Sequence, residues 1–149
     1  MIDVPLTLGA RAPDFSAAAS DGTMVHLAAV LRSSRVVLVF YPGNDTPGCN
    51  RQLGTLRDEI TVYTGAGVRP FGVNPASSAA HAEYAAKLAL PFPLLSDPDR
   101  AIARAYQALR PDGEQIDRTV YLIDRDGSIR FGQRGAPDAE ITLESLREE

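Results

Sequence analysis

The stretch RVVLVFYPGNDTPGC, residues 35–49, carries the strongest structural signals in the chain. Its first seven residues, 35–41, are nearly all apolar and rich in β-branched side chains, which is typical of a strand buried on both faces. The next segment, PGNDTPG at residues 42–48, predicts a loop because its residue types favour turns. Apolar side chains then recur at spacings of three and four, at Leu53, Leu56, Ile60 and Tyr63. This periodicity predicts an amphipathic helix after the loop.

A second strand and helix are expected after the first pair. The segment VRPFGVN, residues 68–74, resembles a short strand, and the alanine-rich segment at about residues 77–89 is typical of a helix. Ser77 or Ser78 is suited to cap the amino end of this helix.

The segment PFPLLSDPDRAIARAYQA, residues 91–108, predicts a short extended piece followed by a helix. Asp97 is the expected N-cap of that helix, with Pro98 at its first position. The tail from Asp138 onward is expected to form a last helix.

Two Asp-Gly pairs predict hairpin turns. Segments 119–124 and 128–131 have strand-like composition and flank Asp126-Gly127. A weaker hairpin signal lies in FSAAASDGTMVHL, residues 15–27, which is expected to turn at Asp21-Gly22.

The order of these elements indicates an α/β fold. Strands alternating with helices and followed by a hairpin predict a mixed central sheet flanked by helices on both faces, with an N-terminal β-hairpin. This order is compatible with a thioredoxin-like fold, although periodicity alone leaves other three-layer α/β arrangements open. A length of 149 residues predicts a single domain, residues 1–149.

Composition excludes several classes of function. The net charge of −4 argues against nucleic acid as a partner, because phosphate binding needs clustered positive charge. No apolar stretch is long enough to span a membrane, and the amino end lacks the pattern of an export signal. We therefore expect a cytoplasmic protein. With one cysteine in the chain, an intramolecular disulfide, a CxxC redox pair and a multi-cysteine zinc site are all excluded.

That cysteine, Cys49, is placed where its sulfur would be reactive. Thr46 is a natural N-cap, Pro47 suits the first helical position, and Gly48 leaves space beside the backbone, so Cys49 falls in the first helical turn. Helix amino ends favour anions, and the thiolate is the nucleophilic form of cysteine. A lone cysteine is often inert packing, but the polar neighbours here suit an exposed turn. Both interpretations stay open on this local context alone.

Several segments resemble one known family. Residues 42–49 match the peroxiredoxin signature P-x-x-x-T-x-x-C, and FYPGNDTPGCNRQLGTLRDE around it is similar to the bacterioferritin comigratory protein (peroxiredoxin Q) branch. GARAPDF near the start, PFPLLSDPDRAIARAY in the middle and RTVYLIDRDGSIRF late in the chain resemble the same branch. The resemblance runs from about Leu8 to Phe131. It implies a thioredoxin-like fold and a thiol-dependent peroxidase.

The resemblance also implies roles for four residues. Cys49 falls at the peroxidatic position, whose thiolate attacks one peroxide oxygen and becomes a sulfenic acid. Thr46 matches the threonine that hydrogen-bonds the peroxide and the thiolate, and Pro42 matches the proline that shields the pocket from water. Arg118 matches the arginine beside the cysteine. A guanidinium is always protonated and offers several donors, so it can stabilise charge on sulfur and on the leaving oxygen.

The chain departs from this branch at one position. Many members carry a resolving cysteine five residues after the first, where this chain has Gly54. The recycling thiol must then come from outside: a thioredoxin, a glutaredoxin or a low-molecular-weight thiol. The expected substrates are hydrogen peroxide and organic hydroperoxides, with no cofactor and no metal, in a monomer or a homodimer. The alternatives are a peroxide sensor and a non-catalytic binding module.

Other residues are expected to be structural. His26 and His81 lack the spacing of a metal site, and His81 is expected to be solvated on a helix surface. The aspartates 97, 99, 124 and 126 are interpreted as turn and cap residues, since they lack the spacing of a calcium loop. Phe40 and Tyr41 are expected to line the core and the pocket wall.

Overall fold

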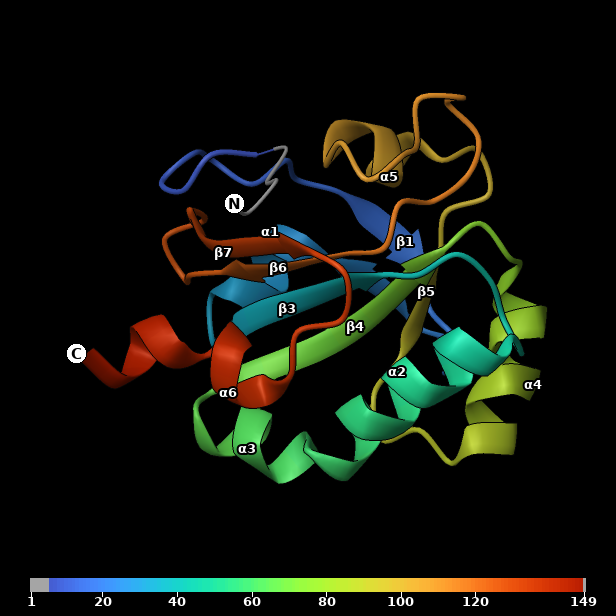
Figure 1. The fold of residues 1–149 in the computed structure, drawn as a ribbon, viewed down its shortest axis with the longest axis horizontal. Coiled ribbons are helices and arrows are strands. Elements are labelled where there is room, and N and C mark those ends of the chain that lie inside the picture. Colours follow the sequence, from blue (N-terminus) through green and yellow to red (C-terminus); the bar gives the residue numbers. More distant parts are fainter. Residues whose placement is uncertain (1–5, 149) are drawn as a thin grey trace.

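The computed structural model describes residues 6–148. Its elements, in chain order, are β1 (Ser16–Ala18), β2 (Met24–His26), α1 (Leu27–Leu31), β3 (Arg35–Phe40), α2 (Pro47–Asp58), α3 (Ile60–Gly65), β4 (Val68–Asn74), α4 (Ser78–Leu88), β5 (Leu94–Ser96), α5 (Ala101–Ala105), β6 (Thr119–Ile123), β7 (Ile129–Arg134), α6 (Ala139–Thr142) and a short 3₁₀ helix (Glu144–Glu148). Figure 1 shows how they are arranged.

A five-stranded mixed sheet forms the centre of the molecule, in the order β5-β4-β3-β6-β7. The strand predicted from the apolar run, β3, is the middle strand. It pairs in parallel with β4 and antiparallel with β6, so it is covered on both edges as well as both faces. The hairpin β1-β2 forms a separate two-stranded sheet. The predicted mixed sheet and amino-terminal hairpin are therefore confirmed.

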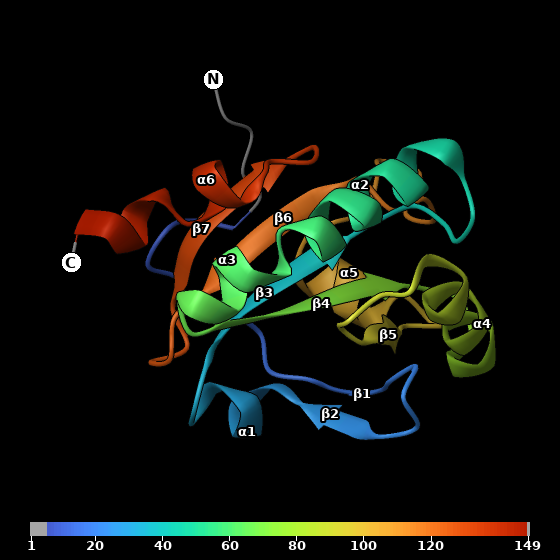
Figure 2. The same ribbon diagram turned by 90° about the horizontal axis from the view of Figure 1, so that it is seen from below.

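The side chains of β3 alternate between two apolar layers, as the period of two in a strand requires. Val36, Leu38 and Phe40 face a layer that also contains residues of α1, α5 and the β1-β2 hairpin. Val37, Val39 and Tyr41 face a layer built with residues of α2, α3, α4 and α6. Figure 2 shows α2 and α3 along one face of the sheet and α1 with the hairpin on the other. The predicted helices on both faces are thus confirmed.

Two helix predictions need correction. The helix expected through Leu53 and Tyr63 is two helices, because Glu59 leaves helical geometry with φ −99° and ψ 11°. The apolar spacing continues across this break, so periodicity could not reveal it. The helix expected within residues 91–108 is α5. It begins at Ala101 rather than Pro98, and its N-cap position is Arg100 in left-handed geometry. Asp97 nevertheless accepts hydrogen bonds from the backbone N–H groups of residues 102 and 103, so it satisfies that helix end from a distance.

The remaining aspartates that were expected in turns are found there, and one of them also forms ion pairs. Asp99 and Asp126 accept backbone hydrogen bonds within their own turns. Asp124 also pairs with Arg35 at 3.1 Å and with Arg130 at 2.7 Å, which ties the β6-β7 turn to both neighbouring strands. No helix within residues 6–148 is long and apolar enough to cross a membrane.

Candidate active site

Cys49 lies in the first turn of α2, as predicted from its neighbours. The N-cap is Thr46, whose hydroxyl oxygen accepts from the Cys49 backbone N–H at 3.4 Å, and Pro47 is the first helical residue. The Thr46 carbonyl accepts from the Asn50 N–H at 2.8 Å. Local sequence therefore positions the cysteine, since the cap and the proline start the helix here.

The Cys49 side chain is buried, although its polar neighbours suit an exposed turn. Pro42, Asp45 and Thr46 are exposed in the loop, but the Cys49 side chain is 0% exposed and packs with Leu53 in the layer below α2. The loop is thus an exposed turn and the sulfur is not. The difference arises because Cys49 is four residues before Leu53, on the same inward face of the helix.

Arg118 brings positive charge to this buried sulfur. Its Nη2 donates to the Cys49 Sγ at 3.6 Å. The two residues are 69 apart in sequence and meet because β3 and β6 are antiparallel neighbours, with Phe40 opposite Thr119. The end of β3 and the start of β6 therefore lie at the same edge, and the predicted approach of Arg118 to Cys49 is observed.

Gln52 orients the guanidinium and was not singled out from the sequence. Its side-chain oxygen accepts from Arg118 Nη1, so one guanidinium bonds both the sulfur and the amide. Gln52 is three residues after Cys49, a spacing that places two side chains on neighbouring positions of a helix. That spacing was the signal available in the sequence.

Gly48 provides the room for this arrangement. A Cβ built on Gly48 would lie 3.3 Å from Arg118 Nη2, which is tighter than an ordinary packing contact. The space predicted beside the Gly48 backbone is therefore occupied by the guanidinium.

A buried polar chain holds the loop that precedes Cys49. The Tyr41 hydroxyl donates to Asn44 Oδ1 at 2.7 Å, and the Asn44 amide lies 3.2 Å from His81 Nδ1. His81 Nε2 is 3.3 Å from the Asn74 carbonyl oxygen. These distances fit a neutral imidazole that accepts at Nδ1 and donates at Nε2.

The prediction that His81 is solvated is therefore wrong. Its side chain is 0% exposed, and burial lowers the pKa of its imidazole. The residue pattern of α4 could not show this, because the groups that contact His81 come from the end of β4 and from the segment after β3. Within residues 6–148, no group of His, Cys, Asp or Glu is arranged to hold a metal ion.

Helix α4 also contacts the first turn of α2 and the loop before it. The Tyr84 hydroxyl donates to Asn50 Oδ1 at 2.6 Å, and Lys87 pairs with Asp45 at 2.7 Å. Burial raises the pKa of Tyr84 to about 12, so its hydroxyl stays protonated and can donate. Asp45 has a φ of 58°, a left-handed conformation that aspartate tolerates better than most residues.

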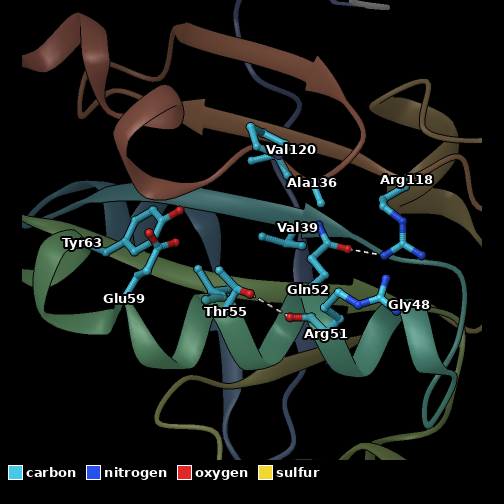
Figure 3. A pocket seen from close by; sticks show the side chains of 12 residues that line it. Val39, Gly48, Arg51, Gln52, Thr55, Glu59, Tyr63, Arg118, Val120 and Ala136 are labelled. Atoms are coloured by element: carbon cyan, nitrogen blue, oxygen red, sulfur yellow. Dashed lines mark hydrogen bonds between the residues drawn. The ribbon is translucent and has the colours of Figure 1, made fainter.

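A pocket of about 330 Å³ adjoins the guanidinium (Figure 3). Gly48 and Arg118 line it at one end, and Glu59 and Tyr63 lie at the other. Its wall is apolar where Val39 of β3 and Val120 of β6 face it. Neither Pro42 nor Thr46 lines this pocket.

The structure brings together three of the four predicted site residues. Cys49, Thr46 and Arg118 are linked by the hydrogen bonds described above. Pro42 follows Tyr41 at the end of β3 and is exposed. Its role as a shield of the pocket stays a prediction.

Known proteins share both the sequence and the fold around this site. The model of the AhpC/TSA family matches residues 8–131. The chain belongs to the AhpC/TSA family. Residues 8–131 include the loop, the cysteine and Arg118, and they are also the span over which the sequence resembles peroxiredoxins.

Individual relatives place this peroxiredoxin in the bacterioferritin comigratory protein and peroxiredoxin Q branch. A protein of Mycobacterium tuberculosis that is assigned by name to the peroxiredoxins is 36% identical over 137 residues, which are 86% of this chain and 85% of the relative. The chloroplastic peroxiredoxin Q of Sedum lineare is 32% identical, over 95% of this chain and 78% of the relative.

Solved peroxiredoxin structures share the fold. The peroxidoxin BcpB of Mycobacterium tuberculosis superposes with a TM-score of 0.85 at 26% identity, covering 95% of this chain and 96% of that one. The bacterioferritin comigratory protein of Xanthomonas campestris gives 0.79 at 28% identity, covering 98% and 96%. The thioredoxin-like fold is thereby confirmed. Peroxiredoxins are thiol-dependent peroxidases, so this chain is an oxidoreductase of that class.

Proposed function

We propose that Cys49 is the peroxidatic residue and that it works without a second cysteine of the chain. The observation that carries this proposal is the 3.6 Å contact between the Arg118 guanidinium and the Cys49 sulfur. A fixed positive charge beside a sulfur favours its ionised, nucleophilic form. The sulfur also lies at the amino end of α2, where unpaired N–H groups favour negative charge.

The first half of the reaction oxidises the sulfur. The Cys49 thiolate attacks the terminal oxygen of ROOH, the O–O bond breaks, and the alkoxide or hydroxide leaves and takes up a proton. Cys49 becomes a sulfenic acid. Arg118 stabilises the charge that develops on the leaving oxygen, and Thr46 hydrogen-bonds the peroxide. Pro42 excludes water from the entrance.

The proposed substrates are hydrogen peroxide and organic hydroperoxides. The bacterioferritin comigratory protein of Xanthomonas campestris has alkyl peroxide reduction activity, which supports organic hydroperoxides as substrates here. Because the chain has one cysteine, an external thiol must reduce the sulfenic acid. Thioredoxin, glutaredoxin and a low-molecular-weight thiol are the candidate donors.

The test is a single-turnover oxidation with one equivalent of hydrogen peroxide or an organic hydroperoxide. Quenched samples are analysed by mass spectrometry, because the chain has no tryptophan to report the reaction by fluorescence. We expect the wild type to gain one oxygen on Cys49 and the Cys49→Ser variant to consume no peroxide. Arg118→Ala should oxidise roughly 100-fold more slowly, the typical cost of losing one charge-stabilising donor. Wild-type rates in either variant would contradict the mechanism.

A peroxide sensor is the second candidate, and the absence of another cysteine in the chain favours it. The same experiment extended to many turnovers separates the two functions. An enzyme turns over with at least one of the three thiol donors. A sensor is oxidised fast once and then passes its oxidation to a partner protein without steady-state turnover.

A further inference from the structure

The pocket beside Arg118 has a charge distribution that the peroxide reaction does not use. Figure 3 shows the guanidinium groups of Arg51 and Arg118 at the end near Gly48, and Glu59 at the opposite end. Between them the wall is apolar. The volume of about 330 Å³ lies within the range of small-ligand sites, and neither hydrogen peroxide nor a neutral organic hydroperoxide carries a charge that would pair with a cation here.

Arg51 and Arg118 differ in their partners. Arg118 is engaged by Cys49 and Gln52. The Arg51 side chain makes no hydrogen bond or ion pair with any residue between 6 and 148. It is an unpaired cation on the lining of a pocket, so an anionic group entering this end of the pocket has an available partner.

The pocket and the Cys49 sulfur share one neighbouring group, the Arg118 guanidinium. Cys49 is 0% exposed, so any reagent must displace something to reach it. The Arg118 guanidinium both lines the pocket and touches the sulfur, and Gly48 beside it has no side chain. A small molecule held at this end of the pocket would therefore lie beside the guanidinium that contacts Cys49.

We propose that this pocket binds the recycling reductant, a low-molecular-weight thiol that carries a carboxylate. The carboxylate pairs with Arg51, and the thiol faces Arg118 and Cys49. Glu59 repels a carboxylate from the far end, so the charges of the pocket set the orientation. A concave site of this size fits a small molecule rather than the active-site surface of a redox protein. The inference rests on the proposed formation of a sulfenic acid at Cys49.

The chemistry needs two molecules of the thiol. The first, RSH, attacks the sulfur of Cys49–SOH and forms Cys49–S–S–R, while the hydroxyl leaves as water. The second RSH attacks this mixed disulfide, which releases RS–SR and restores the Cys49 thiol. The sulfenic sulfur is reduced and the two small thiols are oxidised.

The test measures the reductive half-reaction separately. Protein pre-oxidised with one equivalent of hydrogen peroxide is mixed with 3-mercaptopropionate, 2-mercaptoethanol or cysteamine, and rates are normalised to the thiolate present. We expect the anionic thiol to react about fivefold faster than the neutral one, as for one exposed ion pair, and the cationic thiol to be slowest. In Arg51→Gln the anionic advantage should disappear, and in Arg51→Glu it should reverse.

The matched control is Arg104→Gln, which removes the same charge from α5, outside the pocket. It should keep the wild-type ratio between thiols. Equal rates for the three thiols in the wild type, or an unchanged ratio in Arg51→Gln, would overturn the inference. Reduction by thioredoxin alone would do so as well. Failure of the proposed function is distinguishable, because Cys49 would then gain no oxygen in the first step.

Discussion

Gly48 controls how closely the Arg118 guanidinium approaches the sulfur. A methyl group at this position would lie 3.3 Å from Arg118 Nη2, so the guanidinium would have to shift by a few tenths of an ångström. We expect Gly48→Ala to slow single-turnover oxidation of Cys49 by roughly three- to tenfold, because small displacements of a catalytic group are costly. Quenched-flow kinetics with hydrogen peroxide, analysed by mass spectrometry, would measure this effect.

Gly54 provides the matched control on the same helix. A Cβ there meets only Arg57 Nη2, at an ordinary 3.6 Å. Gly54→Ala should therefore oxidise at the wild-type rate and gain about 1 kcal/mol of stability from helix propensity. If Gly48→Ala also oxidised at the wild-type rate, the position of the guanidinium would not limit the reaction. The structure shows no steric reason for glycine at position 54.

At the scale of elements, α4 and the loop after β3 are joined by the buried polar chain through His81. The pKa of His81 is lowered in the folded protein by burial, and its ordinary value is 6.5. The unfolded chain therefore binds more protons than the folded one below this pH. The contribution of neutral His81 to the free energy of unfolding should be fully present above pH 6.5. It should be lost as the pH falls from there through the lower pKa of the folded state.

Thermal unfolding between pH 5 and 8 would test this dependence. The wild type should lose Tm as the pH falls below about 6.5. His81→Gln cannot titrate there, so its Tm should depend less on pH, even if its stability at pH 8 is lower. His26→Gln, at an exposed histidine of β2, should keep the wild-type slope. An equal slope in His81→Gln and the wild type would contradict the assignment.

At the scale of the whole molecule, the sheet separates two apolar layers with different consequences for the site. Leu53 and Leu95 are both fully buried, but Leu53 lies in the layer with Cys49 and Leu95 in the opposite one. Either leucine changed to alanine should lower the free energy of unfolding by about 2–5 kcal/mol. Denaturant titration of both variants would measure these losses.

Only Leu53→Ala should also disturb the reaction. Leu53 packs below the same face of α2 as Cys49, so its loss should loosen the helix and slow oxidation by roughly tenfold. Leu95→Ala should retain the wild-type oxidation rate under conditions in which it is folded. If the two variants slowed oxidation equally, the effect would come from global stability rather than from the seating of α2.

Much of the architecture could be predicted from sequence because its signals are local. The apolar run at 35–41 predicted β3 almost to its last residue, and Thr46 with Pro47 predicted the start of α2. The errors also have local causes. Pro98 suits a first helical position, yet the chain first makes a left-handed turn at Arg100.

Local patterns were enough to predict that the single cysteine lies in the first turn of a helix after a buried strand, since caps, prolines and apolar runs act over a few residues. Long-range packing, in contrast, encloses this sulfur, buries His81 beside the loop and brings Gln52 to Arg118. These facts depend on the antiparallel pairing of β3 with β6 and on the packing of α4. Such contacts join residues far apart in the chain, and no local pattern encodes them; resemblance to a family had to supply the role of Arg118.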